Sequence, residues 1–212
     1  MSRSRKEKVI CPQCGKQTDI TIWETINAEM NPVENRQLLD RTLFRFTCEC
    51  GYTAEIDANM LYHNMTHHAM VYYINEESIE QTENMFADLR QHSEFEMTNY
   101  IYRIVTSQNA LREKAIILEN GLDDRVIELV KLFFYAQIQE QLSGEINEVL
   151  FFAEDGEWFL QFFGSSSTTV VLPIIFYKKI RDQYATQLEK VGNKDLHIDV
   201  QWAVKFLGYD KD

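Results

Sequence analysis

The four cysteines of the chain are the residues whose types and spacing most clearly carry chemistry. They form two close pairs, Cys11 with Cys14 and Cys48 with Cys50, and a glycine directly follows each pair. A glycine at that position lets the backbone turn with positive φ, so that amide N–H groups point at the sulfurs. Four thiolates brought together in this way suit one tetrahedral Zn²⁺. We therefore predict a zinc site with all four cysteines as ligands.

A zinc ion with four cysteine ligands has no open position for water, so its predicted role is structural rather than catalytic. Two other uses of the cysteines stay open. The Cys11–Cys14 segment is similar to a redox dithiol, but a redox dithiol opens a helix and a strand is predicted to follow here. An iron–sulfur cluster would also use four thiolates, although no other feature of the sequence indicates electron transfer.

The composition of the chain argues against some kinds of binding partner and favours one cellular compartment. The 212 residues carry a formal net charge of −12, which disfavours broad binding to nucleic acids or anionic membranes. The basic segment Arg3–Lys8 is the exception, and we expect it to be a solvated, frayed terminus. No apolar run approaches a membrane span or the core of a secretory signal. We expect a cytoplasmic protein without a membrane association, in a reducing compartment that favours metal ligation over disulfides.

Short strands are the elements that must position the cysteines. Alternating apolar residues predict three strands: one over about residues 17–26, one that ends at Cys48, and one over about 52–56. Two cysteine turns between antiparallel strands are typical of a zinc ribbon. Residues 31–35 contain a proline and two asparagines and indicate a loop, and residues 57–67 are expected to form a loop or a short helix.

After residue 68, the sequence patterns predict further strands and helices. Strands are predicted over about 69–74 and 100–105, a helix over about 79–91, and two further helices over about 111–119 and 124–138, the second capped by Asp123. An Asp155-Gly156 turn predicts a hairpin within 149–163, followed by a strand at 168–172 and helices over about 175–190 and 200–207, the last capped by Asp199. We expect an α+β protein with a zinc-ribbon-like domain and helical extension over 1–143 and an α+β subdomain over 144–212, separated at Ser143-Gly144.

Several blocks of the sequence resemble the CpXC family of bacterial and archaeal proteins. They are the two cysteine pairs, the segment Leu61-Tyr62-His63-Asn64, and Leu111–Lys114 followed by Gly121–Glu128. Together they span roughly residues 9–135. The resemblance implies a cysteine metal site and a prokaryotic origin, and it implies no reaction.

Other polar residues have both a functional and a structural interpretation. His63, His67 and His68 are close enough in sequence for a second metal site, although histidines in a loop explain them as well. Asp123, Asp124 and Arg125, with Glu128 beyond, are candidates for acid–base chemistry, but helix capping and an Arg125–Glu128 ion pair explain the same residue types. We interpret the neighbouring Glu113-Lys114 as a solvated helix face.

We predict a zinc-stabilised interaction or regulatory protein whose partner is another protein or a second copy of the chain. The aromatic strand with Trp158, Phe159, Phe162 and Phe163 is a candidate surface, unless the chain's own helices cover it. The alternative is an enzyme, such as a hydrolase, with a site around Tyr62, His63 and Asp123-Asp124-Arg125. A third interpretation, nucleic-acid binding, would require a basic patch from residues such as Lys8, Lys16, Arg41 and Arg45.

Overall fold

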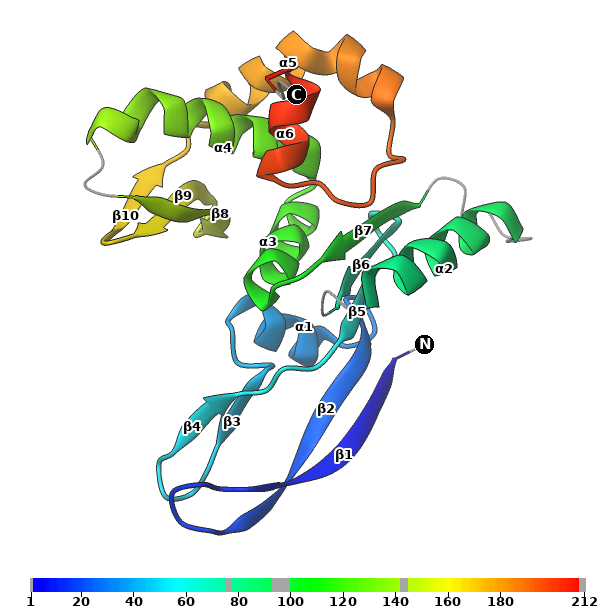
Figure 1. The fold of residues 1–212 in the computed structure, drawn as a ribbon, viewed down its shortest axis with the longest axis vertical. Coiled ribbons are helices and arrows are strands. Elements are labelled where there is room, and N and C mark those ends of the chain that lie inside the picture. Colours follow the sequence, from blue (N-terminus) through cyan, green and yellow to red (C-terminus); the bar gives the residue numbers. More distant parts are fainter. Residues whose placement is uncertain (1, 75–77, 93–99, 142–144, 210–212) are drawn as a thin grey trace. The chain divides into compact units, whose positions relative to one another are not determined.

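The computed structural model describes residues 2–74, 78–92, 100–141 and 145–209. Within these ranges it contains six α-helices and ten strands arranged in three sheets, which confirms the predicted α+β class. The chain forms two compact units, Met1–Arg112 and Glu113–Asp212, coloured from blue to red in Figure 1. The boundary predicted at Ser143-Gly144 lies outside the described residues.

A five-stranded mixed sheet organises the first unit, in the order β1-β2-β5-β6-β7. These strands are β1 (Arg3–Ile10), β2 (Gln17–Asn27), β5 (Met60–Asn64), β6 (Ala69–Tyr73) and β7 (Ile101–Val105). β1 pairs with β2 and β5 with β6 in antiparallel hairpins, whereas the β2–β5 and β6–β7 pairs are parallel. The short strands β3 (Arg45–Thr47) and β4 (Thr53–Glu55) form a separate antiparallel hairpin.

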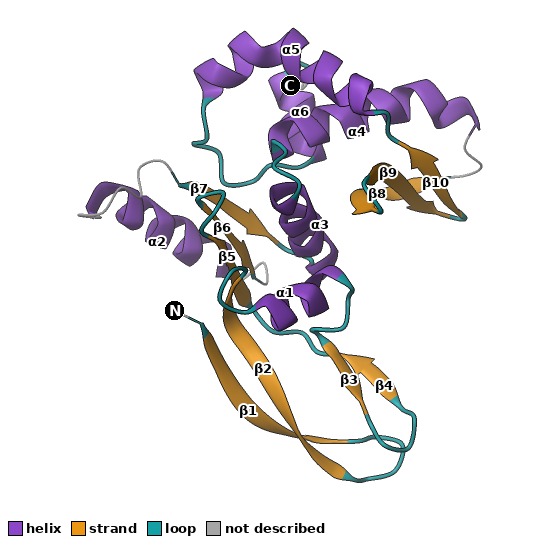
Figure 2. Cartoon of the chain, turned by 180° about the vertical axis from the view of Figure 1, so that it is seen from behind, coloured by secondary structure: helices purple, strands orange, loops and turns teal. Residues whose placement is uncertain are grey.

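The first unit also contains the helices α1 (Pro32–Leu39) and α2 (Ile79–His92). Figure 2, seen from behind, shows α2 alongside the strands β5 to β7. Phe86 of α2 packs on Tyr102 of β7 with ring centroids 5.0 Å apart, and both side chains are fully buried. This contact ties the helix to the sheet through apolar burial.

Three predictions for the first unit are wrong. The basic segment at residues 3–8 is part of β1, which pairs with β2 along its length although almost all of its side chains are exposed. The segment after Asn31 is not a loop, because Pro32 occupies the first position of α1, where a proline loses no helical hydrogen bond. Residues 60–64 form strand β5 rather than a loop or helix, with side chains alternating between buried and half-buried.

The second unit combines a three-stranded antiparallel sheet with helices. Its elements are α4 (Asp124–Ile138), a 3₁₀ turn (Gln139–Gln141), β8 (Ile146–Glu154), β9 (Glu157–Gly164), β10 (Ser167–Val171), α5 (Ile174–Val191) and α6 (Val200–Phe206). Helix α3 (Gln108–Glu119) begins in the first unit and ends in the second. The predicted turn is confirmed: Asp155 and Gly156 both have positive φ between β8 and β9.

The core of the second unit lies between its sheet and α4. Val126, Leu129 and Val130 of α4 are fully buried, as are Phe151, Leu160 and Phe162 of the sheet. Trp158 packs edge-on against Tyr177 of α5 with ring centroids 5.6 Å apart. Within the described part of the chain, no helix is both long and apolar enough to span a membrane.

Candidate metal centre

Each cysteine pair lies in the turn of an antiparallel hairpin. The first turn joins β1 and β2 after the paired residues Ile10 and Gln17, and the second joins β3 and β4 after Thr47 and Thr53. Figure 1 and Figure 2 both show the two turns side by side at one end of the first unit. The strands therefore bring together cysteines that are more than thirty residues apart in the sequence.

The two turns share one hydrogen-bonding scheme. In the first, the Cys11 N–H donates to the Lys16 carbonyl at 2.9 Å and the Gly15 N–H donates to the Cys11 carbonyl at 2.9 Å. In the second, the Cys48 N–H donates to the Tyr52 carbonyl at 2.8 Å and the Gly51 N–H donates to the Cys48 carbonyl at 2.9 Å. Each bond of the second turn spans one residue fewer, because a single residue separates Cys48 from Cys50.

Positive φ angles of 72° at Gly15 and 90° at Gly51 close these turns. Such angles are costly for residues with a Cβ. The glycine after each cysteine pair is therefore required by the backbone conformation, as the sequence pattern predicts.

The four sulfurs lie within 4.8 Å of one another. Cys14 Sγ lies 3.6 Å from Cys48 Sγ, and Cys11 Sγ lies 3.7 Å from Cys50 Sγ. All four thiols are free, with no disulfide between them. A tetrahedral ion with metal–sulfur distances of about 2.3 Å places its sulfurs about 3.8 Å apart. The arrangement fits a single four-coordinate metal ion, and no other group of metal-binding side chains gathers in this way within the described residues.

The protein surroundings favour thiolates at part of this cluster. Burial raises the pKa of the Cys11 thiol, but the backbone N–H groups of Cys14 and Gln13 outweigh it and bring the pKa down to about 7. The backbone N–H of Cys50 lowers the pKa of Cys48, yet burial and the neighbouring Cys11 thiol raise it to about 12. Four adjacent thiols cannot all ionise without a cation, and a bound divalent metal supplies that charge.

Little apolar core supports the two turns. The buried cluster there consists of Cys11, Phe46 and Cys48, and five partly buried side chains pack against it. Cys14 and Cys50 are exposed. Lys16 of the first turn forms an ion pair with Glu49 of the second, but both side chains are largely open to solvent. A shared metal ion would be the strongest link between the turns.

These features define an α+β protein with a four-cysteine cluster built from two hairpin turns. The family model described as CpXC protein matches residues 9–131, which is more than half of the chain. The chain therefore belongs to the CpXC family. A search of curated proteins and a search of solved structures each find no match.

The histidine cluster of the sequence is built differently from a metal site. His63 on β5 lies 3.2 Å from the Tyr100 hydroxyl through Nε2 and 3.4 Å from the Asn27 side-chain nitrogen through Nδ1. His68 has a positive φ of 48° and contacts Tyr100 edge-on. His67 donates its backbone N–H to Asn64 at 2.8 Å, which closes the turn between β5 and β6. Burial lowers the pKa of His63.

The residues of the enzyme hypothesis belong to different units. Tyr62 and His63 are neighbours on β5 in the first unit, so their side chains point to opposite faces of the sheet. Tyr62 is fully buried, and its hydroxyl accepts a hydrogen bond from Asn64 at 3.3 Å. The remaining three candidates, Asp123 to Arg125, lie in the second unit. A common pocket for these residues stays a prediction.

Asp123 and Arg125 have structural roles in the second unit. The Asp123 carboxylate accepts the Arg125 backbone N–H at 2.9 Å, which confirms the predicted N-cap of α4. The same carboxylate binds the Arg125 guanidinium in a bidentate pair at 2.6 and 3.0 Å. Arg125 also donates to the carbonyls of Leu188 at 3.0 Å and Gly192 at 2.5 Å, at the end of α5. The predicted Arg125–Glu128 pair is wrong, because Arg125 reaches back to its own helix cap.

Glu128 instead joins a buried charge cluster with Glu113, Lys114, Asp124 and Lys131. Each of the five side chains is at most 11% exposed. The prediction of a solvated helix face at Glu113-Lys114 is therefore wrong. The cluster is hereafter called the buried ion cluster.

Two lysines connect the carboxylates of the buried ion cluster. Lys131 Nζ lies 3.1 Å from Glu113 and 2.9 Å from Glu128, and Lys114 Nζ lies 3.1 Å from Asp124 and 3.4 Å from Glu128. Burial lowers the pKa of Lys131, but the two carboxylates outweigh it and raise the pKa above its usual range. Burial raises the pKa of Glu113, the charge of Lys131 opposes that rise, and the charge of Glu128 adds to it.

A pattern in the sequence indicates this cluster. Asp124, Glu128 and Lys131 are spaced i, i+4 and i+7, so they share one face of α4. The residues around them in this helix are apolar on its other faces, including Val126, Ile127 and Val130. A helix that is apolar on the remaining faces is a buried helix, so its charged stripe must find charged partners inside the protein.

Proposed function

We propose that the chain is a protein-binding module of the reducing cytoplasm, stabilised by one structural Zn²⁺ held by Cys11, Cys14, Cys48 and Cys50. The observation that carries the metal part is the closeness of the four sulfurs, which all lie within 4.8 Å of one another. When bound, zinc supplies a fixed positive charge that holds four thiolates together without redox chemistry. Because four thiolates fill the tetrahedron, the ion has no position left for a substrate.

A cobalt titration tests the closed site. Co²⁺ added to metal-free protein under reducing conditions is expected to give the absorption of a tetrahedral four-thiolate centre at one ion per chain. Added azide or imidazole is expected to leave that spectrum unchanged, since no coordination position exchanges. A spectral change on adding either ligand would mean an open site and would contradict the structural role.

An apolar row on the second sheet supports the binding part of the proposal. Phe152 and Phe159 stack with ring centroids 4.9 Å apart, and both are only half-buried. Val171 lies opposite Phe159 in the sheet, and it is 53% exposed. Directly opposite residues share one face of a sheet, so the row continues across three strands. Contiguous exposed apolar patches are a feature of protein-binding surfaces, and this row supports such a patch here.

The two faces of the predicted aromatic strand differ in burial. Phe162 is fully buried and Trp158 packs on α5, so the chain's own helices cover that face. Phe159 and Phe163 remain half-buried on the other face. The partner that we propose there is another protein or a second copy of the chain.

A photo-crosslinking amino acid at position 171 tests this surface in cells. We expect a crosslinked product from Val171 and none from the exposed polar position Lys178 on α5. Mass spectrometry of the product distinguishes a second copy from a different protein. Equal crosslinking from both positions, or none from position 171, would contradict the proposed binding surface.

A further inference from the structure

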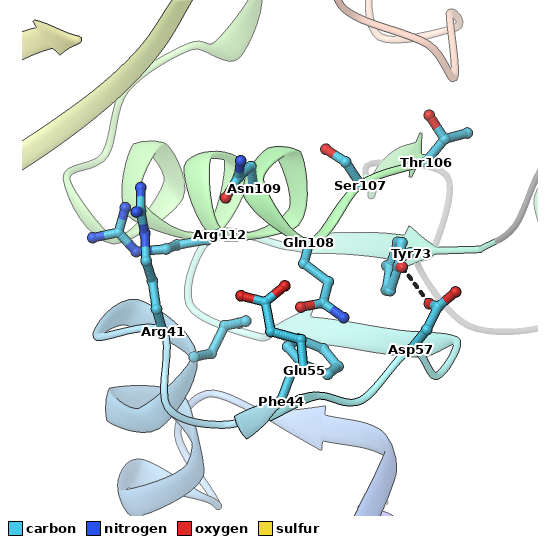
Figure 3. A pocket seen from close by; sticks show the side chains of 11 residues that line it. Arg41, Phe44, Glu55, Asp57, Tyr73, Thr106, Ser107, Gln108, Asn109 and Arg112 are labelled. Atoms are coloured by element: carbon cyan, nitrogen blue, oxygen red, sulfur yellow. Dashed lines mark hydrogen bonds between the residues drawn. The ribbon is translucent and has the colours of Figure 1, made fainter. Parts of the chain in front are cut away.

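A cavity of about 380 Å³ in the first unit is lined by charged groups of both signs. Figure 3 shows its side chains, which come from the end of α1 and the following loop, from β4 and the loop after it, from β6, and from the start of α3 and the loop before it. All of them lie within Met1–Arg112. A cavity of this size matches small-molecule sites in proteins.

Two arginines form one side of the cavity. Arg41 is exposed, and Arg112 is half-buried with its Nε donating to the Leu39 carbonyl at 2.5 Å. Burial and then the positive charge of Arg41 lower the pKa of Arg112. Neither guanidinium forms an ion pair with a carboxylate within the described residues. The charge of Asp40 acts on Arg112 without a direct ion pair. Two neighbouring guanidiniums that no carboxylate binds directly are suited to an external carboxylate, which they bind through paired hydrogen bonds.

The Asp57 carboxylate lies on the other side. Asp57 accepts the hydroxyl of Tyr73 at 2.5 Å, and Figure 3 places this pair away from the two arginines. Glu55 projects between the two sides, near Gln108, whose side-chain nitrogen is fixed by the Ile56 carbonyl at 2.8 Å. Glu55 and Asp57 are both exposed, so their carboxylates can accept hydrogen bonds from an ammonium group.

The surface between the charged sides is partly apolar. Phe44 and the buried Leu38 line it, and Phe44 is held edge-on against Tyr73 with ring centroids 6.0 Å apart. An aliphatic portion of a ligand would cover these side chains.

We propose that this cavity binds a small zwitterionic molecule, a free amino acid or a short peptide. Its carboxylate lies against Arg41 and Arg112, and its ammonium group faces Glu55 and Asp57. The two positive and two negative side chains of the lining balance, which favours a ligand with separated opposite charges over a polyanion. The proposal is independent of the metal and of the surface on the second sheet.

Calorimetric titration of the full chain with leucine and with the dipeptide alanyl-leucine tests the proposal. We expect saturable binding of at least one of them. The C-amidated and the N-acetylated forms of that ligand each lack one charge. We expect each of them to bind at least about tenfold more weakly than the ligand itself.

Variants locate the site. Arg41→Asn removes one guanidinium at a position with a φ of 67°, which asparagine tolerates, and is expected to weaken binding about tenfold or more. Arg36→Gln makes the same charge change on the exposed face of α1, outside the lining, and is expected to leave binding unchanged. Glu55→Gln is expected to weaken binding of the zwitterion but not of its N-acetylated form.

Three results would overturn the proposal. They are no saturable binding of either compound at millimolar concentration, equal binding of the amidated or acetylated forms, and equal weakening by Arg41→Asn and Arg36→Gln. Circular dichroism of each variant confirms that a loss of binding does not come from a loss of fold.

Discussion

The cysteine cluster of the first unit and the buried ion cluster of the second solve the same physical problem in different ways. Each gathers groups that repel one another when ionised: four thiols in one, three carboxylates in the other. The carboxylates have their cations within the chain, since Lys114 and Lys131 lie between them. Beside the thiols, Lys16 interacts through its charge with Cys14 and Cys48, but its side chain is exposed and paired with Glu49, so we expect a bound metal ion to supply the remaining counter-charge.

The difference also concerns packing. The buried ion cluster lies between α3 and α4, and the other faces of α4 are filled with apolar residues, so the second unit has a core of its own. The cysteine turns have only a small apolar cluster around Phe46. We expect the metal to decide whether the turns fold, and the buried ion cluster to adjust the stability of a unit that folds by apolar burial.

Loss of a cysteine ligand should have the largest effect. Cys48→Ser removes a buried cysteine of the cluster and is expected to abolish metal binding and hydrogen-exchange protection in β3 and β4, while α4 keeps its protection. Zinc contributes on the order of 10 kcal/mol to the folding of isolated zinc-finger peptides, so the local effect is large. The neighbouring Thr47→Ser, on an exposed side chain, is the control. Unchanged protection of β3 and β4 in Cys48→Ser would show that the metal is not needed there.

Loss of a buried lysine should come next. Lys131→Met leaves Glu113 and Glu128 without their shared cation, and breaking a buried ion pair costs about 3–5 kcal/mol. Urea unfolding followed by exchange or fluorescence of the second unit measures this loss.

Lys178→Met is the matched control for Lys131→Met. It makes the same replacement on an exposed position of α5 and is expected to change the free energy of unfolding by less than about 0.5 kcal/mol. Equal effects of the two variants on the free energy of unfolding would mean that loss of the Lys131 charge leaves no costly unpaired carboxylate in the buried ion cluster.

The pH dependence of stability should reveal the titration of the Glu113 carboxyl. Because the pKa of Glu113 is raised in the folded state, its contribution to stability is complete below the unfolded pKa near 4.5 and is lost as the pH rises through the folded value. Glu113→Gln removes this titration while its amide oxygen can still accept the Phe151 N–H, which Glu113 binds at 2.6 Å.

We therefore expect the stability of the native chain to fall more steeply than that of Glu113→Gln as the pH rises above about 4.5. The difference in slope is at most about 1.4 kcal/mol per pH unit, the value for one proton. The exposed Glu154→Gln serves as control, and parallel pH profiles for the native chain and Glu113→Gln would contradict the raised pKa.

The surface ion pair between the two cysteine turns should matter least. Glu49→Gln removes the partner of Lys16, but both side chains are exposed and screened by solvent. We expect metal content and the melting temperature to stay within error of the native values. A clear loss of metal in Glu49→Gln would mean that the ion pair, rather than the metal, assembles the turns.

The sequence predicts elements well where one local rule decides the conformation. The cysteine–glycine turns, the Asp155-Gly156 hairpin and the cap at Asp123 all depend on residues close together in the chain. The loop predicted at Pro32 and the ion pair predicted for Arg125 failed because another local rule applies there, and the other predictions failed where a distant partner decides. Strand β1 carries no apolar alternation, and it forms because β2 offers it a complete hydrogen-bonding edge.

The buried ion cluster shows the same limit for a candidate site. Glu113 and Lys114 look solvated in isolation, since charged residues are rarely buried. Their burial follows from α4, whose charged face supplies partners for both. The cavity beside Arg41 is also assembled from distant segments, from Leu38 to Arg112, so its charge pattern becomes apparent only in the folded chain.

Metal analysis of the purified chain tests most directly the claim that a metal ion holds the two cysteine turns together. The protein is purified under reducing conditions, and its zinc and iron are measured before and after exposure to a strong chelator, with hydrogen exchange followed in residues 9–56. We expect about one zinc per chain, and loss of protection in these residues when it is removed. Protein that contains no metal and keeps full protection in both turns would contradict the claim.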